Sequence, residues 1–111
     1  MLIYIASPYT NAEESVREEN YRIVSMIAAE IVAEGSVAFS PITYGHTLLK
    51  YKEMPSDWPF WKNFCLTFLS KCDKIIVYKM PGWDKSKGVG EEIEFAKENG
   101  IIIEYIEYLP K

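Results

Sequence analysis

Short apolar runs alternate with longer amphipathic stretches along the whole chain, and no other feature limits the possible folds as strongly. The apolar runs lie at residues 2–6, 36–40, 74–78 and 101–106. Continuous runs of this length are typical of strands that are buried on both faces of a parallel sheet. Short strands that alternate with helices predict right-handed crossovers. The sequence therefore predicts an α/β fold with a mostly parallel open sheet.

The stretches between these runs carry apolar residues at helical spacing. We expect a first helix that Gly35 ends, a second over residues 58–69, and a third from near Gly88 to Gly100. Helices on both faces of such a sheet form a three-layer α/β/α sandwich of the flavodoxin- or Rossmann-like kind. We expect the first strand to be central in it.

Two local patterns predict where the regular elements begin and end. Thr10 and Glu13 match a capping box, with a hydroxyl at the cap and a carboxylate three residues later. Pro41 is expected to end the second strand, and a loop over residues 42–46 to follow it. For residues 47–52 the pattern leaves open whether there are one or two helical turns.

Length, charge and hydropathy limit the class of protein. With 111 residues the chain fits one domain, whose modest core oligomerisation often supplements. A formal net charge of -4 argues against a nucleic-acid polymer as partner. We find neither a secretory signal nor an apolar run long enough to span a bilayer, so we expect a cytoplasmic protein without membrane contact.

The two cysteines, Cys65 and Cys72, lie seven residues apart. This spacing is not that of a Cys-x-x-Cys redox motif, and no further cysteine or histidine follows at zinc-site spacing. We therefore expect two free thiols, no bound metal and no other cofactor.

In open α/β sheets, ligands bind beyond the carboxyl ends of the strands, where the strand order reverses. The segments 7–10, 40–46 and 78–92 should meet there. The last of them joins a strand end to a helix start. Free backbone N–H groups at that start, with Ser86 and Lys87 just before it, suit an anion.

The glycines of this segment do not form a dinucleotide-binding fingerprint. Gly88 and Gly90 supply the first half of Gly-x-Gly-x-x-Gly, but Ile93 stands where the third glycine belongs. A flexible loop followed by an acidic first helical turn, which complements the helix dipole, explains the same residues. Both interpretations stay open.

Several aromatic and titratable residues also have a purely structural explanation. Trp58 and Trp61 are typical of a core, whereas Trp83, in a loop rich in Gly, Ser and Lys, is harder to explain that way. His46 is the only histidine, and a single histidine in a loop is more often incidental than catalytic. Tyr4 fits core packing, but a buried hydroxyl needs a partner.

Taken together, six segments resemble the nucleoside 2-deoxyribosyltransferase-like superfamily, and within it a small, functionally uncharacterised bacterial and phage branch. In chain order they are Leu2-Ile3-Tyr4-Ile5-Ala6-Ser7-Pro8-Tyr9, Phe39-Ser40-Pro41-Ile42, Asp57-Trp58-x-x-Trp61, Cys72-Asp73, Gly82-Trp83-x-x-Ser86-x-Gly88-Val89 and Glu92-Ile93-x-x-Ala96. The resemblance covers nearly the whole chain and so implies one domain of this kind over residues 1–111.

The resemblance implies a set of catalytic residues, because the superfamily includes the 2′-deoxynucleoside 5′-phosphate N-hydrolases. Their nucleophilic glutamate matches Glu92, with Ala96 four residues later. Asp73 matches an aspartate that could protonate the leaving base, and Tyr4 a tyrosine that could orient Glu92. Glu91 would point about 100° away from Glu92 around a helix, and we expect it to be dispensable for activity.

The resemblance and the expected site together give a set of substrate-binding residues. They are Ser7, Pro8, Tyr9, Ser40, His46, Trp83, Ser86, Lys87, Gly88 and Gly90. Of these, Ser7, Ser86, Lys87 and the amides near Gly88 would hold a 5′-phosphate. The base specificity does not carry over, because the histidine loop and the tryptophan segment differ from those of the characterised enzymes.

The implied activity is cleavage of the base–sugar bond of a nucleoside or deoxynucleoside 5′-monophosphate. A nucleoside deoxyribosyltransferase, and a non-catalytic module that binds or senses a nucleotide, are the alternatives. In each case the partner is a small nucleotide or nucleoside. The many aromatic residues between Tyr51 and Phe68 also predict a homodimer or a larger homo-oligomer.

Overall fold

The computed structural model describes residues 1–109 and shows strands that alternate with helices. The strands are β1 (Leu2–Ala6), β2 (Val37–Phe39), β3 (Lys74–Lys79) and β4 (Ile102–Glu107). The helices are α1 (Glu14–Ala33), α2 (Pro41–Leu49), α3 (Trp58–Leu69) and α4 (Lys87–Glu98), with a short three-ten helix η1 (Trp83–Lys85) before α4. Among the described residues, no helix is long and apolar enough to cross a membrane.

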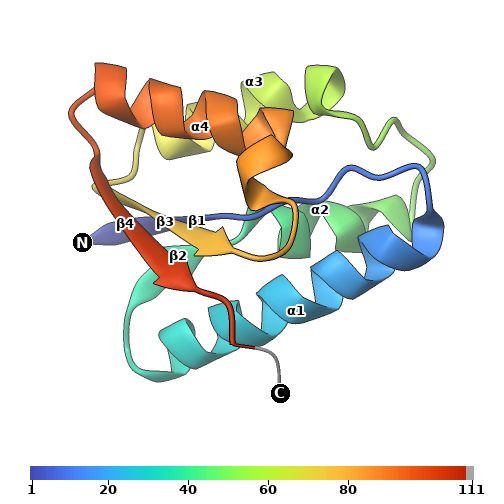
Figure 1. Cartoon of the computed structure of the whole chain (residues 1–111), viewed down its shortest axis with the longest axis horizontal. Coiled ribbons are helices and arrows are strands. Elements are labelled where there is room, and N and C mark those ends of the chain that lie inside the picture. Colours follow the sequence, from blue (N-terminus) through green and yellow to red (C-terminus); the bar gives the residue numbers. More distant parts are fainter. Residues whose placement is uncertain (110–111) are drawn as a thin grey trace.

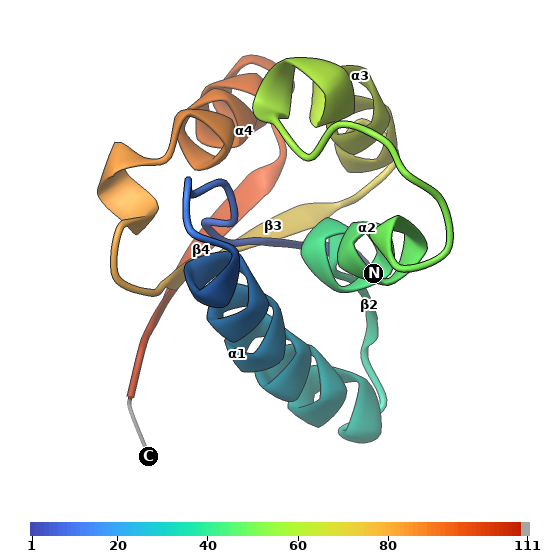
Figure 2. The same ribbon diagram turned by 90° about the vertical axis from the view of Figure 1, so that its right-hand side faces the viewer.

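The strands form one parallel sheet in the order β2-β1-β3-β4. In this register Tyr4 of the central strand β1 pairs with Phe39 on one side and with Ile75 on the other. Helix α1 covers one face of the sheet, α3 and α4 cover the other, and α2 packs against α1 beside the edge strand β2 (Figures 1 and 2). The three-layer α/β/α architecture and the central first strand are therefore confirmed.

Alternate residues of β1 contribute to two cores, one on each face of the sheet. Tyr4 and Ala6 are fully buried with Leu69 of α3. Ile5 is fully buried on the other face with Val24 of α1. Burial on both faces explains why this strand is a continuous apolar run rather than an alternating one.

Helix α1 does not begin with the expected capping box. It starts at Glu14, and Glu13 at its N-cap makes no capping hydrogen bond with its side chain. Instead, the Asn11 side-chain oxygen accepts a hydrogen bond from the Glu13 N–H at 2.9 Å. Because this asparagine turn satisfies the local backbone, the Thr10 side chain is not used as a cap.

The segment after β2 is a helix and not the expected loop. Pro41 occupies the start of α2, where its missing N–H is not needed. Ser40 caps this helix by accepting a hydrogen bond from the Thr43 N–H at 3.1 Å. Pro41 therefore ends the strand and also starts a helix, which gives His46 a fixed place on α2.

Candidate functional site

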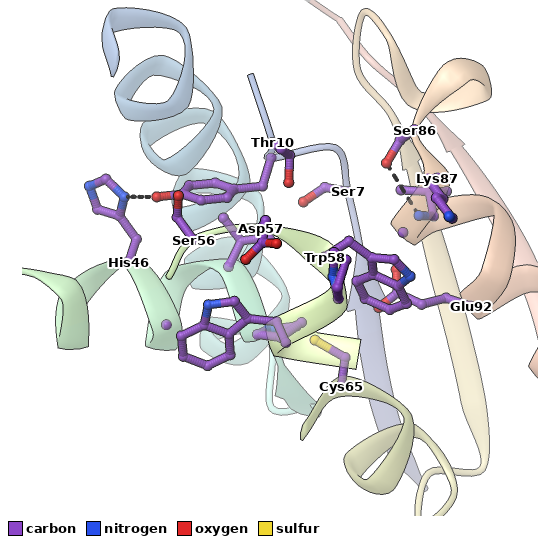
Figure 3. Close-up of a pocket in the computed structure, with 18 of the residues that line it drawn as sticks. Ser7, Thr10, His46, Ser56, Asp57, Trp58, Cys65, Ser86, Lys87 and Glu92 are labelled. Carbon is purple, nitrogen blue, oxygen red and sulfur yellow. Dashed lines mark hydrogen bonds between the residues drawn. The ribbon is translucent and has the colours of Figure 1, made fainter. Parts of the chain in front are cut away.

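A cavity of about 370 Å³ opens beyond the carboxyl end of β1. Its walls come from the β1–α1 turn, from α2, from the start of α3 and from the start of α4 (Figure 3). The adjacent strands β1 and β3 lead into α1 and α4, which lie on opposite faces of the sheet, and ligands bind at such switch points. Of the residues predicted from the sequence, those that line the cavity are Ser7, Tyr9, His46, Ser86, Lys87, Gly88 and Glu92.

Glu92 is a buried acid at one end of this cavity. It projects from α4 and is only 4% exposed. The Tyr4 hydroxyl, buried behind it, donates a hydrogen bond to Oε2 of Glu92. Burial raises the pKa of Glu92 to about 8, and the hydrogen bond from Tyr4 opposes this rise only in part. Burial also raises the pKa of Tyr4 well above its usual value, so the tyrosine remains a donor.

Cys65 of α3 lies next to this pair and also lines the cavity (Figure 3). Burial, and then the charge of nearby Glu92, raise the pKa of its thiol to about 12. A thiolate is the reactive form of cysteine, so this thiol is not a nucleophile at neutral pH. Glu92, with a pKa of about 8, is therefore the group of this pair and thiol that changes its charge near neutral pH.

Asp73 does not lie in the cavity, and the expectation that it shares a pocket with Glu92 is wrong. It directly precedes β3, where its carboxylate accepts a hydrogen bond from the Leu2 N–H at 2.7 Å. The Asp73 N–H in turn donates to the Leu2 carbonyl at 2.8 Å. In a parallel sheet a residue before a strand lies at the amino ends, whereas the cavity lies beyond the carboxyl ends.

The start of α4 and Ser7 together form a polar corner suited to an anion. Ser86 caps α4 by accepting a hydrogen bond from the Val89 N–H at 3.2 Å. The N–H groups of Lys87 and Gly88, at the first two helical positions, have no acceptor within the helix. Within the described chain, the Ser7 hydroxyl is buried without a hydrogen-bond partner. These donors lie in the cavity wall at the positive end of the helix dipole.

Trp58, at the first position of α3, forms the wall of the cavity beside α4. Its indole N–H donates to Oε2 of Glu91 at 2.7 Å, and Lys62 pairs with Oε1 of the same carboxylate at 2.7 Å. A Cβ atom at Gly88 would lie only 3.0 Å from the Trp58 ring. Glu91 thus points away from the cavity, as expected, but it holds a residue of the cavity wall in place.

Trp61, one turn further along α3, lies against α2. Its indole N–H donates to the Pro55 carbonyl at 2.9 Å. A Cβ atom at Gly45 would lie 3.3 Å from the Trp61 ring. Two indole rings, each held by its own N–H, therefore give the cavity a preorganised aromatic wall.

His46 lies at the end of the cavity far from Glu92 (Figure 3). Its Nδ1 is 2.6 Å from the Tyr9 hydroxyl, and its Nε2 is 2.7 Å from a carboxylate oxygen of Glu18. Its ring stacks on Tyr21, with centroids 4.1 Å apart. This histidine, which the sequence places in a loop, instead lies on α2 and is fixed between α1 and α2.

A family model described as "Domain of unknown function (DUF1937)" matches residues 1–107. The chain belongs to the DUF1937 family. No curated protein matches it. The family description assigns no activity, so the likeness of this DUF1937 chain to the nucleoside 2-deoxyribosyltransferase-like superfamily stays a prediction, and its function has to be argued from the site.

Four predicted binding residues of the DUF1937 chain do not line the cavity. They are Pro8, Ser40, Trp83 and Gly90. Ser40 is used as the cap of α2. Trp83 of η1 packs against Tyr105 of β4, with ring centroids 5.8 Å apart. A Cβ atom at Gly90 would meet no other atom within 4 Å, so this glycine borders open space outside the cavity lining.

Other residues of the DUF1937 site were not predicted from the sequence. They include Ser56, Asp57, Trp58, Trp61 and Cys65. A signal existed for the tryptophans, because a spacing of three residues places both on one helix face. The same spacing fits a buried core equally well, however. Only the packing of α3 against α2 and α4 shows that the tryptophans line a cavity. Within residues 1–109, no group of three or more His, Cys, Asp or Glu side chains is placed to hold a metal ion.

Proposed function

We propose that this protein is an N-glycosidase that cleaves the base–sugar bond of a nucleoside or deoxynucleoside 5′-monophosphate, with Glu92 as nucleophile. The observation that carries this proposal is the buried carboxyl group of Glu92. It is held by the Tyr4 hydroxyl and lines a ligand-sized cavity beside the polar corner formed by Ser7 and the start of α4.

The chemistry follows that of a retaining glycosidase. The Glu92 carboxylate attacks the anomeric carbon, the carbon–nitrogen bond breaks, and its electron pair leaves with the base. A covalent sugar–Glu92 ester results. Water then hydrolyses it to release the sugar phosphate and restore the carboxylate, and the proton that this water gives up neutralises the base anion released in the first step. Tyr4 holds Oε2 and so leaves Oε1 of Glu92 to attack. Positive charge develops on the sugar, which favours the ionised form of the buried acid.

The phosphate would occupy the corner formed by Ser7 and the start of α4. The unpartnered Ser7 hydroxyl, the Lys87 ammonium and the free N–H groups there supply the donors that a phosphate needs. A cavity of about 370 Å³ lies at the small end of the range for ligand sites, as expected for one mononucleotide.

The test is release of free base from a panel of nucleoside and deoxynucleoside 5′-monophosphates, followed by chromatography. Glu92→Gln keeps the shape and the hydrogen bond from Tyr4 but cannot form the ester. We expect it to lower kcat by roughly a thousandfold or more. Glu94→Gln, on the exposed side of the same helix, is the matched control and should act like the parent. Equal base release by Glu92→Gln and the parent would overturn the proposal.

One observation favours a second candidate, a module that binds or senses a nucleotide without cleaving it. Because burial raises the pKa of Glu92 to about 8, most of this acid is neutral at pH 7, and a neutral acid is a poor nucleophile. In that case no base is released, and Glu92→Gln binds a monophosphate as tightly as the parent. A deoxyribosyltransferase differs from both, since it would form a new nucleoside when a second free base is added.

A cytoplasmic setting is part of the proposal. Cys65 and Cys72 are both free, and free thiols are typical of reducing compartments. Nucleotides of the proposed kind are also substrates of intracellular chemistry.

A further inference from the structure

Tyr9, His46 and Glu18 form a hydrogen-bonded chain from the cavity to the protein surface. The Tyr9 hydroxyl is 2.6 Å from Nδ1 of His46, and Nε2 of His46 is 2.7 Å from Oε2 of Glu18. Tyr9 and His46 line the cavity, whereas the Glu18 side chain is 55% exposed. The three residues come from the β1–α1 turn, from α2 and from α1, so the fold brings them together.

The imidazole of His46 has a fixed orientation. Its ring stacks on Tyr21 at an interplanar angle of 24° and meets the Tyr9 ring edge-on at 76°. Both of its nitrogens are engaged, and its side chain is only 11% exposed. The position of the Tyr9 hydroxyl is therefore set from behind, and the remaining hydrogen-bonding capacity of this oxygen can face a ligand in the cavity.

The hydrogen bond with Nδ1 of His46 determines whether the Tyr9 hydroxyl can donate or accept a further hydrogen bond. Glu18 accepts from Nε2–H in either state. When His46 is neutral, Nδ1 accepts the Tyr9 O–H, and the phenol oxygen is left as an acceptor. When His46 is protonated, Nδ1–H donates to that oxygen, and the Tyr9 O–H is freed to donate.

Other charged groups also surround the hydrogen-bonded residues Tyr9, His46 and Glu18. The charge of Arg17, and its hydrogen bond to the phenol, lower the pKa of Tyr9, whereas the charges of Glu18 and Glu14 raise it. The Lys50 ammonium lies 5.1 Å from the centroid of the ring on which His46 stacks. Asp57 lines the same cavity from the start of α3. Burial, the largest effect on Tyr9, raises the pKa of its phenol, which keeps its proton.

His46 and Glu92 lie at opposite ends of the cavity, with Trp58 beside Glu92 (Figure 3). A nucleotide whose anomeric carbon faces Glu92 extends its base along the aromatic wall toward Tyr9. We infer that Tyr9, positioned by His46 and Glu18, is the specificity-determining residue that hydrogen-bonds the polar edge of the base. This inference rests on the nucleotide pocket of the proposed function and assigns its base-recognition end.

Affinity measurements by titration calorimetry test this inference on Glu92→Gln protein, which binds without turnover. The probes are the common deoxynucleoside 5′-monophosphates and 2-deoxyribose 5-phosphate, which has no base. We expect Tyr9→Phe to lower the affinity for the best-bound nucleotide roughly tenfold and to leave the affinity for the sugar phosphate unchanged. His46→Phe, which keeps a stacking ring but no nitrogen, should have the same selective effect. Tyr44→Phe removes a hydroxyl from the same helix outside the cavity wall and should change neither affinity.

The outcomes separate this inference from the proposed activity. Two results would overturn the inference: an unchanged nucleotide affinity in Tyr9→Phe, or an equal loss of affinity for nucleotide and sugar phosphate. Either would show that the hydrogen bonds of Tyr9, His46 and Glu18 only stabilise the packing of α1 against α2. Selective loss of nucleotide affinity without base release by the parent would support the inference while the glycosidase proposal fails. A parent that binds no nucleotide would overturn both.

Discussion

The buried acid is the residue whose chemistry depends most on its surroundings. Glu92 has one hydrogen-bond donor, the Tyr4 hydroxyl, and burial dominates its ionisation. An ordinary glutamate side chain has a pKa of 4.5, but burial raises that of Glu92 to about 8. At pH 7 the Glu92 carboxyl group therefore holds a proton that a substrate with developing positive charge would displace. This coupling has consequences for stability and for activity.

The first consequence is a stability that falls as the pH rises. Between about pH 4.5, where an unfolded glutamate loses its proton, and about pH 8, where folded Glu92 loses it, the folded state binds the extra proton. The contribution of this residue to the free energy of unfolding is therefore greatest below that window and smallest above it. Glu92→Gln cannot ionise, so we expect its melting temperature to exceed that of the parent increasingly from pH 4.5 to pH 8.

Thermal unfolding followed by circular dichroism over this pH range is the measurement. Glu94→Gln serves as the control, because its side chain lies on the exposed side of α4. Parallel pH profiles for the parent and Glu92→Gln would contradict the raised pKa.

Tyr4 should set the pH dependence of activity. Its hydrogen bond is the interaction that lowers the pKa of Glu92 against the effect of burial. In the parent we expect kcat/KM to rise with pH through about 8, as Glu92 becomes ionised. Tyr4→Phe should move this rise upward by about one pH unit, because one hydrogen bond to the carboxylate is lost. Rate profiles for base release decide the matter, and an unshifted profile with a lower plateau would mean that Tyr4 does not tune Glu92.

At the scale of elements, local patterns were sufficient to predict the strands and most helices. The apolar run at residues 2–6 is β1, and the tryptophan segment is α3. Helix α2 was not predicted, because Pro41 is compatible both with the end of a strand and with the first position of a helix. Here the decision depends on Ser40, whose hydroxyl caps the helix only once the chain has turned.

The candidate site could be predicted only in part, for a related reason. The polar corner near Ser86 follows from a strand-to-helix junction, which is a local pattern. The aromatic wall follows from how α3 packs against α4, which no local pattern reports. The prediction for Asp73 is wrong because the resemblance gave this residue a catalytic role without regard to strand direction. Because β1 and β3 are parallel, Asp73 lies at the amino ends of the strands, whereas Ser7 lies at their carboxyl ends.

The contact between α3 and α4 predicts opposite effects for two glycines on α4. Gly88→Ala would put a methyl group 3.0 Å from the Trp58 ring, which Glu91 holds in place. We expect ligand affinity to fall roughly tenfold as the indole shifts. Gly90→Ala meets open space within a helix, so it should raise the free energy of unfolding by about 0.5–1 kcal/mol and leave affinity unchanged. Chemical denaturation and calorimetry measure the two effects, and equal affinities for the two variants would contradict this account of the cavity wall.

At the scale of the whole molecule, aromatic side chains form a cluster that is partly exposed beside the edge strand β2. Phe39 of this strand stacks on Phe68 of α3, with centroids 4.5 Å apart, and Tyr44 of α2 stacks on Phe64 at 5.9 Å. Phe68 remains 42% exposed and Tyr44 47% exposed. An apolar surface next to an unpaired strand edge is typical of a protein–protein contact.

We therefore predict a homodimer that uses this cluster, in agreement with the expectation from the aromatic content of the sequence. Val37 of β2 is 63% exposed and lies on the same side of the strand as Phe39, since the two are separated by one residue. In a two-fold contact each copy presents the same patch, so Val37→Glu would bring two like charges together. We expect the parent to sediment as a dimer and Val37→Glu as a monomer with an unchanged circular dichroism spectrum. Leu109→Glu, which adds the same charge at an exposed apolar position after β4, should stay dimeric. A parent that sediments as a monomer, or a Val37→Glu variant that remains dimeric, would show that this surface does not join two copies.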